Sequence, residues 1–404
     1  MANRVKKTVC IVSTVPPEGG GVSTYTKNLF DAFDSSSFEL VFLAQKSSRP
    51  YPRIGNAKIV GCWAIGLWYP FQIFKSLCRY KPSVVHVQHE YFIFGSAMSS
   101  AIFPLLSVFS RFLRTKFVIT LHGVVNPVEI RDPELSSVGN ESLKGIPKSV
   151  SQIGLLLITK LFLLNSDKVV LMNQTHSDVL VREYHCSKEK IVLIPHGIPR
   201  CVVIDKDSAK KQLGFSGKKV VLYFGYLTKY KGIDILIKAF NQIDNPNSVL
   251  IIGGSVHPRL KNELEYKKYF DSITKLISEN SRIKLVGFIP DDVLSTYVSA
   301  ADIVVFPYIA SFSTGGPMNI TLGHHKPVIA SKVSSFSDVL PKMAVFKTGS
   351  VSDLARLLRQ AISDGQFVEE LAKSTEHIAE ERSWKNIACL TSDLYKHLLT
   401  EQKS

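Results

Sequence analysis

Two lysines lie where a strand of this protein should end. Lys229 and Lys231 follow the apolar run KKVVLYFG and precede Gly232 and an amphipathic, helical stretch. A cation in the turn after a strand can neutralise a phosphate group. Most lysine pairs in loops are simply solvated, but the position at a strand end favours phosphate binding here.

Three consecutive glycines form a second candidate anion site. Gly19, Gly20 and Gly21 lead into a predicted helix that carries Ser23 and Thr24 in its first turn. Free backbone amides and the positive end of a helix dipole suit an anion. The spacing is not GxGxxG, and no acid follows at the next strand end, so a nicotinamide or flavin site is not favoured.

A third loop of small residues precedes a mostly apolar segment that ends at His324 and His325. The loop reads Ser313, Thr314, Gly315, Gly316 and contains no acid. Its amides and two hydroxyls are suited to phosphate oxygens.

Two histidines follow neighbouring predicted strands. His89 and His122 each come at a strand end, and Glu90 follows His89 directly. A lone histidine is more often structural, but two that face one crevice favour a functional site. Glu90 is the only acid among ten basic residues between Lys46 and Lys116, and it is either a general base or a buried salt-bridge partner.

Short apolar, β-branched runs alternate with helical stretches along the whole chain. They fall into two series, 9–15, 39–45, 83–88, 116–122, 168–173 and 190–197, then 218–225, 247–254, 283–288, 302–307 and 326–331. This pattern predicts two doubly wound, Rossmann-like α/β domains with parallel sheets. Ligands of such sheets bind outside the carboxyl ends of the strands. The polar stretch 197–218 separates the series and predicts domains at 1–197 and 198–380.

Composition excludes several classes of protein. The chain has 404 residues, 45% hydrophobic and 21% charged, as an ordinary globular protein has. Its six cysteines form no CxxC pair, which fits a reducing compartment and no disulfide framework. The opening MANRVKKTVCIVSTV is better read as a first strand than as a signal peptide. Asp205-Lys206-Asp207 matches a metal-binding DxD, but Asp207 suits a helix N-cap, and we expect no metal.

Positive charge is concentrated in the first half of the chain. The net charge is +15, and residues 1–197 hold 22 Lys and Arg against 13 Asp and Glu. Apolar, aromatic stretches at 63–74 and 102–113 accompany the basic residues. This combination suggests contact with an anionic bilayer surface, and a core helix with a solvated basic rim is the alternative. No nucleic-acid motif is present, and 91–110 is too rich in glycine, proline and serine for a spanning helix.

Over almost its full length, the sequence resembles the retaining glycosyltransferases of the GT-B fold, of the family 4 type. Seven stretches carry the resemblance in the family's order: GGGVSTYTKNL (19–29), VVHVQHEYFIFG (84–95), VITLHG (118–123), IPHGI (194–198), YFGYLTKYKGIDILIKAF (223–240), LVGFIPDDVLSTYVSAADIVVFPY (285–308) and GHHKPVIAS (323–331). Residues 381–404 resemble the terminal helix that crosses back to the first domain. The resemblance implies two Rossmann-like domains that face each other across a cleft.

The resemblance also implies roles for particular residues. A sugar would pass from a nucleotide-diphosphate sugar to a hydroxyl with retention and without a metal, while His122 contacts the donor sugar. Lys231, assisted by Lys229, would neutralise the leaving diphosphate. The other donor-binding candidates are Gly20, Gly21, Tyr226, Gly254, Ser255, Gly287, Phe288, Ile289, Ser313, Thr314, Gly315, Gly316 and Asn319. The nucleobase would bind at 287–289, and Tyr25, His89 and Glu90 would contact the acceptor.

The sequence departs from the family pattern at the donor sugar. The family usually has two glutamates eight positions apart, and alignment on KPVIAS puts Phe312 and Ile320 there. Tyr226 stands where the family often has arginine. Asn319, next to the second position, could contact the ribose. Phosphate recognition is therefore expected to persist, while sugar recognition by a carboxylate is not.

These observations predict a cytoplasmic hexosyltransferase that can lie peripherally at the inner face of the cell membrane. Its acceptor would be a membrane-associated saccharide, such as a lipid-linked sugar or a growing polysaccharide of the cell envelope. Two alternatives stay open: a sugar-nucleotide epimerase or hydrolase on the same fold, and a non-catalytic partner subunit of a glycosyltransferase complex.

Overall fold

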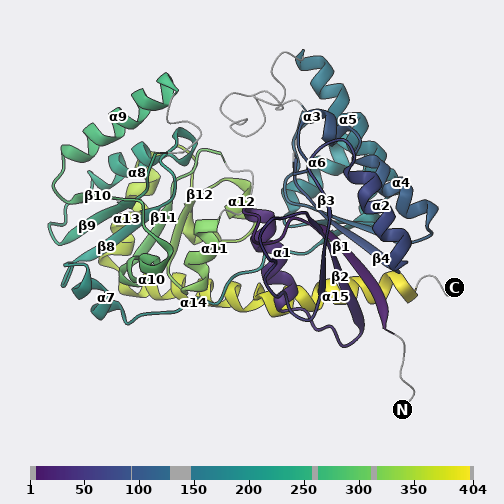
Figure 1. Ribbon diagram of the computed structural model, residues 1–404. Helices are drawn as coiled ribbons and strands as arrows, with labels where there is room; N and C mark the ends of the chain where they lie inside the picture. The colour runs from purple at the N-terminus through teal and green to yellow at the C-terminus, as the bar shows by residue number, and fades with distance from the viewer. Residues whose placement is uncertain (1–5, 92, 128–146, 257–262, 311–315, 401–404) are drawn as a thin grey trace. The chain divides into compact units, whose positions relative to one another are not determined.

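The protein folds into two compact units, each built on one parallel sheet (Figure 1). The computed structural model describes residues 6–91, 93–127, 147–256, 263–310 and 316–400. Unit 1 comprises residues 1–197 and 384–404, and unit 2 comprises residues 198–383. Within the described residues, every helix is too short or too polar to cross a membrane.

Unit 1 contains a seven-stranded sheet in the order β3-β2-β1-β4-β5-β6-β7. The strands are β1 Lys7–Ser13, β2 Phe38–Gln45, β3 Lys58–Trp63, β4 Val84–His89, β5 Lys116–Leu121, β6 Lys168–Leu171 and β7 Ile191–Leu193. The order reverses at β1, which pairs with β2 on one side and β4 on the other. Such a reversal opens a crevice at the carboxyl ends of the strands.

Helices cover both faces of this sheet and form two separate cores. α1 Gly21–Asp31 and α15 Trp384–Thr400 pack on one face. The other face carries α2 Tyr69–Tyr80, α4 Pro104–Phe112, α5 Lys148–Asn165 and α6 Gln174–Tyr184, with the short α3 Ala97–Ala101 before α4. Alternate residues of each strand enter opposite cores, because strand side chains point to the two faces in turn. Val84 lies in the first core, for example, and Val85 in the second.

Unit 2 contains a six-stranded sheet in the order β10-β9-β8-β11-β12-β13. The strands are β8 Lys219–Phe224, β9 Ser248–Gly253, β10 Ile283–Gly287, β11 Ile303–Phe306, β12 Val328–Ser331 and β13 Val345–Phe346. The helices are α7 Lys206–Gln212, α8 Ile233–Phe240, α9 Leu264–Ser278, α10 Asp291–Ala300, α11 Gly316–Gly323, α12 Ser334–Ser337, α13 Val351–Ser363 and α14 Gly365–Glu381. The order reverses at β8, between β9 and β11.

The predicted fold class, two doubly wound α/β units, is confirmed. All eleven apolar runs form strands, but two further strands were not predicted. β3 is a partly exposed edge strand that contains Gly61 and Cys62, so it lacks a continuous apolar run. β13 has only two residues.

The chain passes between the units twice, and the two passages pair with each other. The amide of Ile198 donates a 2.7 Å hydrogen bond to the carbonyl of Arg382. Gly197 packs directly against the side chain of Trp384, and a Cβ on Gly197 would lie 2.3 Å from that ring. From Trp384 onward, α15 runs along unit 1 and buries Ile387 and Tyr395 in its core.

Candidate functional site

His122 lies directly after β5, at the carboxyl edge of the unit 1 sheet. Its Nε2 is 2.9 Å from Oε1 of Gln88, and its backbone amide donates a 2.9 Å hydrogen bond to the carbonyl of His89. The Tyr25 ring meets the imidazole edge-on, with centroids 4.7 Å apart. Burial, with neighbouring histidines adding to it, lowers the pKa of His122 to about 3. At neutral pH the side chain is therefore an uncharged hydrogen-bonding group.

The prediction that His89 and His122 face one crevice is wrong. His89 pairs with Leu121 in the β4–β5 register, one position before His122, so the two side chains lie on opposite faces of the sheet. His89 is buried among aromatic rings, and its ring centroid lies 4.4 Å from that of Phe103 and 5.5 Å from that of Phe162. That burial gives no support to a contact between His89 and an acceptor.

The other acceptor candidates differ in exposure. Tyr25 is 2% exposed, and its ring lies 5.2 Å from His196 and 5.1 Å from Trp384. It supports His122 by packing and has almost no surface to offer an acceptor. Glu90 is exposed at the end of β4, which excludes the interpretation as a buried salt-bridge partner. A general-base role for Glu90 stays a prediction.

The glycine loop keeps its backbone open and uses its hydroxyls internally. Gly20 is the N-cap of α1 with φ 118°, a conformation that favours glycine. A Cβ on Gly20 or Gly21 would meet nothing within 4 Å. The Ser23 hydroxyl donates to the carbonyl of Glu18 at 2.7 Å, and the Thr24 hydroxyl donates to that of Gly20. Any anion bound here would therefore meet the amides of the first turn.

In unit 2, the turn after β8 presents Lys231 against two aromatic rings. Its ammonium lies 3.7 Å from the Tyr308 ring centroid and 5.1 Å from that of Tyr230. Burial lowers the pKa of Lys231 to about 7. Among the residues that the structure describes, no carboxylate forms an ion pair with Lys231. Lys229, at the start of the same turn, is exposed.

Gly232 locks this turn onto the loop after β11. Its φ is 64°, and a Cβ there would lie 2.0 Å from the carbonyl oxygen of Pro307. Beside it, the carbonyl of Tyr230 accepts a 2.7 Å hydrogen bond from the amide of Ile309. The two loops flank the point where the strand order reverses, so Lys231 sits at the predicted ligand-binding edge.

The loops after β8 and β9 also touch. A Cβ on Gly254 would lie 2.3 Å from the carbonyl oxygen of Gly225, so only glycine fits there. The amide of Leu227 donates a hydrogen bond to the carbonyl of Ser255. Tyr226, between these contacts, is exposed.

The predicted nucleobase segment follows β10. Gly287 has φ 76°, Phe288 is 65% exposed, and Ile289 is buried against Gly253. The exposed ring and the adjacent backbone therefore lie at the same edge as the β8 and β9 loops.

The small-residue loop is only partly described. Ser313, Thr314 and Gly315 lie outside the described residues, and Gly316 begins α11. Asn319 is buried in this helix, which does not support a contact with a ribose. His324 follows the last residue of the helix and has a structural contact, with Nδ1 2.8 Å from the carbonyl oxygen of Ile320.

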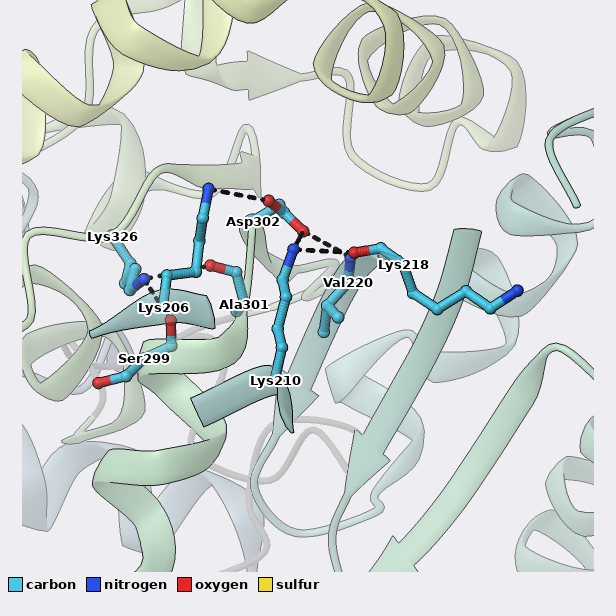
Figure 2. Close-up of polar contacts among 8 residues, drawn as sticks. All are labelled: Lys206, Lys210, Lys218, Val220, Ser299, Ala301, Asp302 and Lys326. Atoms are coloured by element: carbon cyan, nitrogen blue, oxygen red, sulfur yellow. Dashed lines mark hydrogen bonds and ion pairs between the residues drawn. The ribbon is translucent and has the colours of Figure 1, made fainter. Parts of the chain in front are cut away.

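Lys206 of the DxD-like motif joins an ion cluster around Asp302 (Figure 2), while Asp205 and Asp207 are exposed. Asp205, and not the predicted Asp207, caps α7, because its carboxylate accepts from the amide of Ser208 at 2.9 Å. Lys206 and Lys210 pair with Asp302 at 3.3 and 2.6 Å. Nearby, Lys326 donates to the carbonyls of Ser299 and Ala301. These contacts give Asp205 and Lys206 structural roles. Among the described residues, no group of three or more His, Cys, Asp or Glu is arranged for a metal.

The sequence analysis missed the buried partners of His122 and Lys231. Gln88 and His86 lie behind His122, and Tyr308 lies under Lys231. The first pair had a visible signal, since the polar residues His86 and Gln88 stand at alternate positions among the valines of β4. Tyr308 had none, because its contact depends on the pairing of two distant loops.

Two family profiles match the chain in succession. The profile described as Glycosyltransferase Family 4 matches residues 19–200, and that described as Glycosyl transferases group 1 matches residues 205–381. An uncharacterised glycosyltransferase of Methanocaldococcus jannaschii is 23% identical over 248 residues, which are 57% of this chain and 60% of that protein. A GDP-mannose:glycolipid 4-beta-D-mannosyltransferase of Xanthomonas campestris is 27% identical over 112 residues, 27% of this chain and 29% of that protein. Both matches thus span less than two thirds of the relative.

Solved structures match over nearly the full chain. Sucrose-phosphate synthase from Thermosynechococcus elongatus superposes with a TM-score of 0.72 at 18% identity, covering 98% of this chain and all of that one. Anabaena HepE in complex with UDP superposes with a TM-score of 0.68 at 16% identity, covering 98% of this chain and 100% of that one. The fold is therefore that of the GT-B glycosyltransferases. The matches assign the C-terminal half of the chain to the glycosyl transferases of group 1 and its N-terminal half to the family 4 type.

Proposed function

We propose that the protein transfers a hexose from a nucleotide-diphosphate sugar to a hydroxyl of a membrane-associated saccharide or lipid-linked acceptor, with retention and without a metal ion. The observation that carries the donor half of this proposal is Lys231, a half-buried cation without a carboxylate partner among the described residues. A diphosphate would supply the missing negative charge. HepE, a structural neighbour, has been solved with UDP, which is consistent with such a donor.

Lys231 would act in the step where the sugar leaves the diphosphate. Its ammonium is already desolvated against Tyr308, so little reorganisation is needed as charge develops on the leaving group. Removing one such preorganised donor typically costs about 3 kcal/mol of transition-state stabilisation. The amides of Gly20 and Gly21, and that of Gly316 at the start of α11, would add hydrogen bonds to anionic oxygens. Neutralisation by protein groups alone is the reason for proposing a metal-independent reaction.

His122 would hydrogen-bond the donor sugar near the reacting carbon. It is uncharged at neutral pH, so it orients a hydroxyl and does not act as a strong acid. The donor sugar would be held without the usual pair of glutamates, because Phe312 and Ile320 stand at the aligned positions. Ile320 lies half-buried against the core of unit 2. The choice between hexoses would then depend on neutral groups.

The first experiment is calorimetric titration with UDP, GDP, ADP and dTDP. We expect one nucleotide to bind tightly and Lys231→Ala to weaken it by ~100-fold, the equivalent of ~3 kcal/mol. Lys238→Ala is the matched control, because Lys238 is an exposed lysine of α8 that pairs with Asp234. Equal loss in both variants would contradict a specific role of Lys231, and no binding of any nucleotide would favour the non-catalytic alternative.

Stereochemistry and metal dependence are tested on the reaction itself. With the matching nucleotide sugar, we expect the anomeric proton of the first product in an NMR time course to show the configuration of the donor. Rates should be unchanged by EDTA. Inversion, or loss of activity restored by Mg²⁺ or Mn²⁺, would contradict the proposal. Isomerised or hydrolysed donor without any acceptor would identify an epimerase or hydrolase.

A surface of unit 1 supports the proposal that the acceptor is at a membrane. We define the apolar face as the exposed large apolar residues of α2, α4 and α5: Phe71, Val108, Phe112, Val150, Ile153, Leu157, Leu161 and Leu164. The five on α5 recur every three or four residues and so form one stripe along the helix. The three helices adjoin, since α4 contacts both α2 and α5.

Basic groups border this face. Lys75 and Arg79 are exposed on α2, and neither has an ion-pair partner among the described residues. Beside Leu164, a pocket of about 430 Å³ is lined by Arg111, Arg114, Lys116, Lys190 and a single acid, Asp167. Helix C-termini attract cations, which explains part of this charge, but not why it adjoins an exposed apolar stripe. Such a combination matches an anionic lipid surface.

Vesicle flotation tests the membrane half of the proposal. We expect the protein to float with phosphatidylglycerol vesicles at low salt, to bind less at high salt, and to bind phosphatidylcholine weakly. Failure to bind phosphatidylglycerol vesicles at low salt would contradict the membrane half of the proposal. The relative named as acting on a glycolipid is consistent with a lipid-linked acceptor.

A further inference from the structure

A chain of buried side chains connects His122 to the last helix of unit 1. His122 Nε2 is 2.9 Å from Gln88 Oε1, and Gln88 Nε2 is 3.3 Å from His86 Nε2. His86 Nδ1 is 2.5 Å from the hydroxyl of Tyr395 on α15. Gln88, His86 and Tyr395 are at most 1% exposed. Hydrogen bonds with no access to water are strong and costly to leave unmade.

The amide of Gln88 decides which nitrogen of His122 carries the proton. An amide oxygen only accepts, so the 2.9 Å contact requires a hydrogen on His122 Nε2. A neutral imidazole has one N–H, so Nδ1 then bears a lone pair. Nδ1 has no hydrogen-bond partner among the described residues and stays available as an acceptor.

The same amide has the opposite effect on His86. Its NH₂ group only donates, so His86 Nε2 must accept and the proton of His86 must lie on Nδ1. The Thr120 hydroxyl, 2.7 Å from His86 Nε2, then donates as well. His86 Nδ1–H in turn donates to the oxygen of Tyr395. With the amide in this orientation, each group is in a state that satisfies its neighbours.

We infer that Gln88 is a positioning residue that holds His122 as its Nε2–H tautomer and presents Nδ1 as the acceptor for a sugar hydroxyl, and that Tyr395 sets this state from α15 through His86. The inference rests on the proposed function for the identity of the hydroxyl, but not for the tautomer. The tautomer matters because an acceptor nitrogen orients a hydroxyl by its hydrogen, whereas an N–H would orient it by its oxygen.

Imidazole ¹⁵N spectroscopy tests the tautomer directly in the full chain labelled at histidine. The His122 signals are assigned by their loss in His122→Asn. We expect wild-type His122 to show a protonated Nε2 and an unprotonated Nδ1. In Gln88→Met, which keeps the size of the side chain without its amide, the two tautomers should become mixed. The reverse tautomer in the wild type, or an unchanged spectrum in Gln88→Met, would overturn the inference.

Tyr395→Phe tests the longer connection. Without the hydroxyl, His86 Nδ1–H has no acceptor, so His86 should move its proton to Nε2. The Gln88 amide should then turn over and donate to His122 Nε2, which shifts His122 toward the Nδ1–H form. Tyr69→Phe is the matched control, because Tyr69 is a buried tyrosine of unit 1 whose hydroxyl donates to the carbonyl of Ser99. A His122 shift of equal size in both variants would exclude a specific connection.

Kinetics then separate positioning from mere structure. Gln88→Met should lower kcat by about tenfold or more with a small change in KM for the nucleotide sugar. A change in KM alone would overturn the positioning role. If the wild type neither binds a nucleotide nor transfers a sugar, the proposed function fails, while the ¹⁵N spectra still decide the tautomer.

Discussion

The ammonium of Lys231 lies 3.7 Å from the ring centroid of Tyr308, and the two residues come from loops that follow different strands of unit 2. Gly232 and the hydrogen bond from Ile309 to Tyr230 hold these loops together. A cation over an aromatic face is stabilised by the ring quadrupole, but it lacks the full charge that a carboxylate would provide. Lys231 is therefore prepared for an anion.

The first prediction is that nucleotide binding takes up a proton. The pKa of Lys231 is lowered to about 7, so at pH ~8.5 the side chain is mostly neutral. A bound diphosphate favours the ammonium, and binding should take up about one proton at pH ~8.5 and almost none at pH ~5.5. The measurement is calorimetry in two buffers of different ionisation enthalpy. Lys231→Met should abolish the buffer dependence at pH ~8.5, while Lys238→Ala should retain it.

The same pKa shift affects stability without ligand. Because the folded state binds the proton less tightly than the unfolded chain, Lys231 makes the free energy of unfolding rise as pH increases from about 7 to the ordinary lysine pKa of 10.5. Lys231→Met should remove that rise. An identical pH profile in both proteins would contradict the depressed pKa.

The second prediction concerns Gly232. Replacing it with alanine combines a left-handed backbone with a Cβ 2.0 Å from the Pro307 carbonyl oxygen. Gly214→Ala is the control, because φ there is also positive, at 76°, and a Cβ would meet nothing within 4 Å. We expect the control to cost about 1 to 2 kcal/mol and Gly232→Ala about 2 to 3 kcal/mol more.

The two units can be followed separately in that experiment. All three tryptophans, Trp63, Trp68 and Trp384, lie in unit 1, so fluorescence reports its unfolding. Circular dichroism during urea denaturation reports both units. Gly232→Ala should shift only the transition that fluorescence does not detect. Equal destabilisation by the two glycine variants would show that the clash is relieved at little cost.

The strand ends could be located from the sequence, but the face of the sheet on which each side chain lies could not always be predicted. His122 and Lys231 were found because continuous apolar runs of β5 and β8 mark where each strand stops. His89 was misplaced because its face depends on the register of β4 against β5, which the apolar run does not contain. Polar residues at alternate positions, such as His86 and Gln88, were the better signal for that face.

Long-range contacts account for the other differences. The sequence predicted Asp207 as the cap of α7, but Asp205 takes the role, and the next residue, Lys206, pairs with the distant Asp302 together with Lys210. Asn319 was proposed to contact a ribose, but it is buried in α11. Neither outcome depends on local propensity, so sequence pattern alone does not reveal it.

The third prediction concerns Asp302. Its carboxylate accepts from Lys206, from Lys210 and from the amide of Val220 at 2.7 Å (Figure 2). Burial would raise the pKa of Asp302, but these contacts outweigh it and lower the pKa below 3.8. Asp302→Asn should cost about 3 kcal/mol at neutral pH, because Lys210 is left buried without its partner.

The pH dependence of this loss has a definite sign. A carboxyl with a depressed pKa contributes stability above its unfolded value, and the contribution is lost as pH falls through the folded value. The difference between wild type and Asp302→Asn should therefore shrink below pH 3.8. Glu369→Gln, which removes an exposed pair with Lys373, should cost less than about 1 kcal/mol. Circular dichroism during urea denaturation at several pH values makes the comparison.

The fourth prediction is that the apolar face, and not general surface hydrophobicity, holds the protein on lipid. Leu157 and Leu161 lie one turn apart on the exposed stripe of α5. Burying a leucine is worth about 1.5 to 3 kcal/mol, so Leu157→Ser with Leu161→Ser should lower partitioning into phosphatidylglycerol vesicles by at least ~100-fold.

Leu264→Ser is the matched control for that variant, since Leu264 is 66% exposed on α9 of unit 2. It should bind vesicles as the wild type does. An equal loss in both would mean that any exposed leucine contributes and that the face is not specific. If the double variant instead changed a dimer into a monomer in sedimentation and left vesicle binding intact, the apolar face would be an interface between two copies of the chain. Loss of vesicle binding by the double variant alone, with nucleotide affinity unchanged, would place membrane contact on unit 1 and donor binding elsewhere.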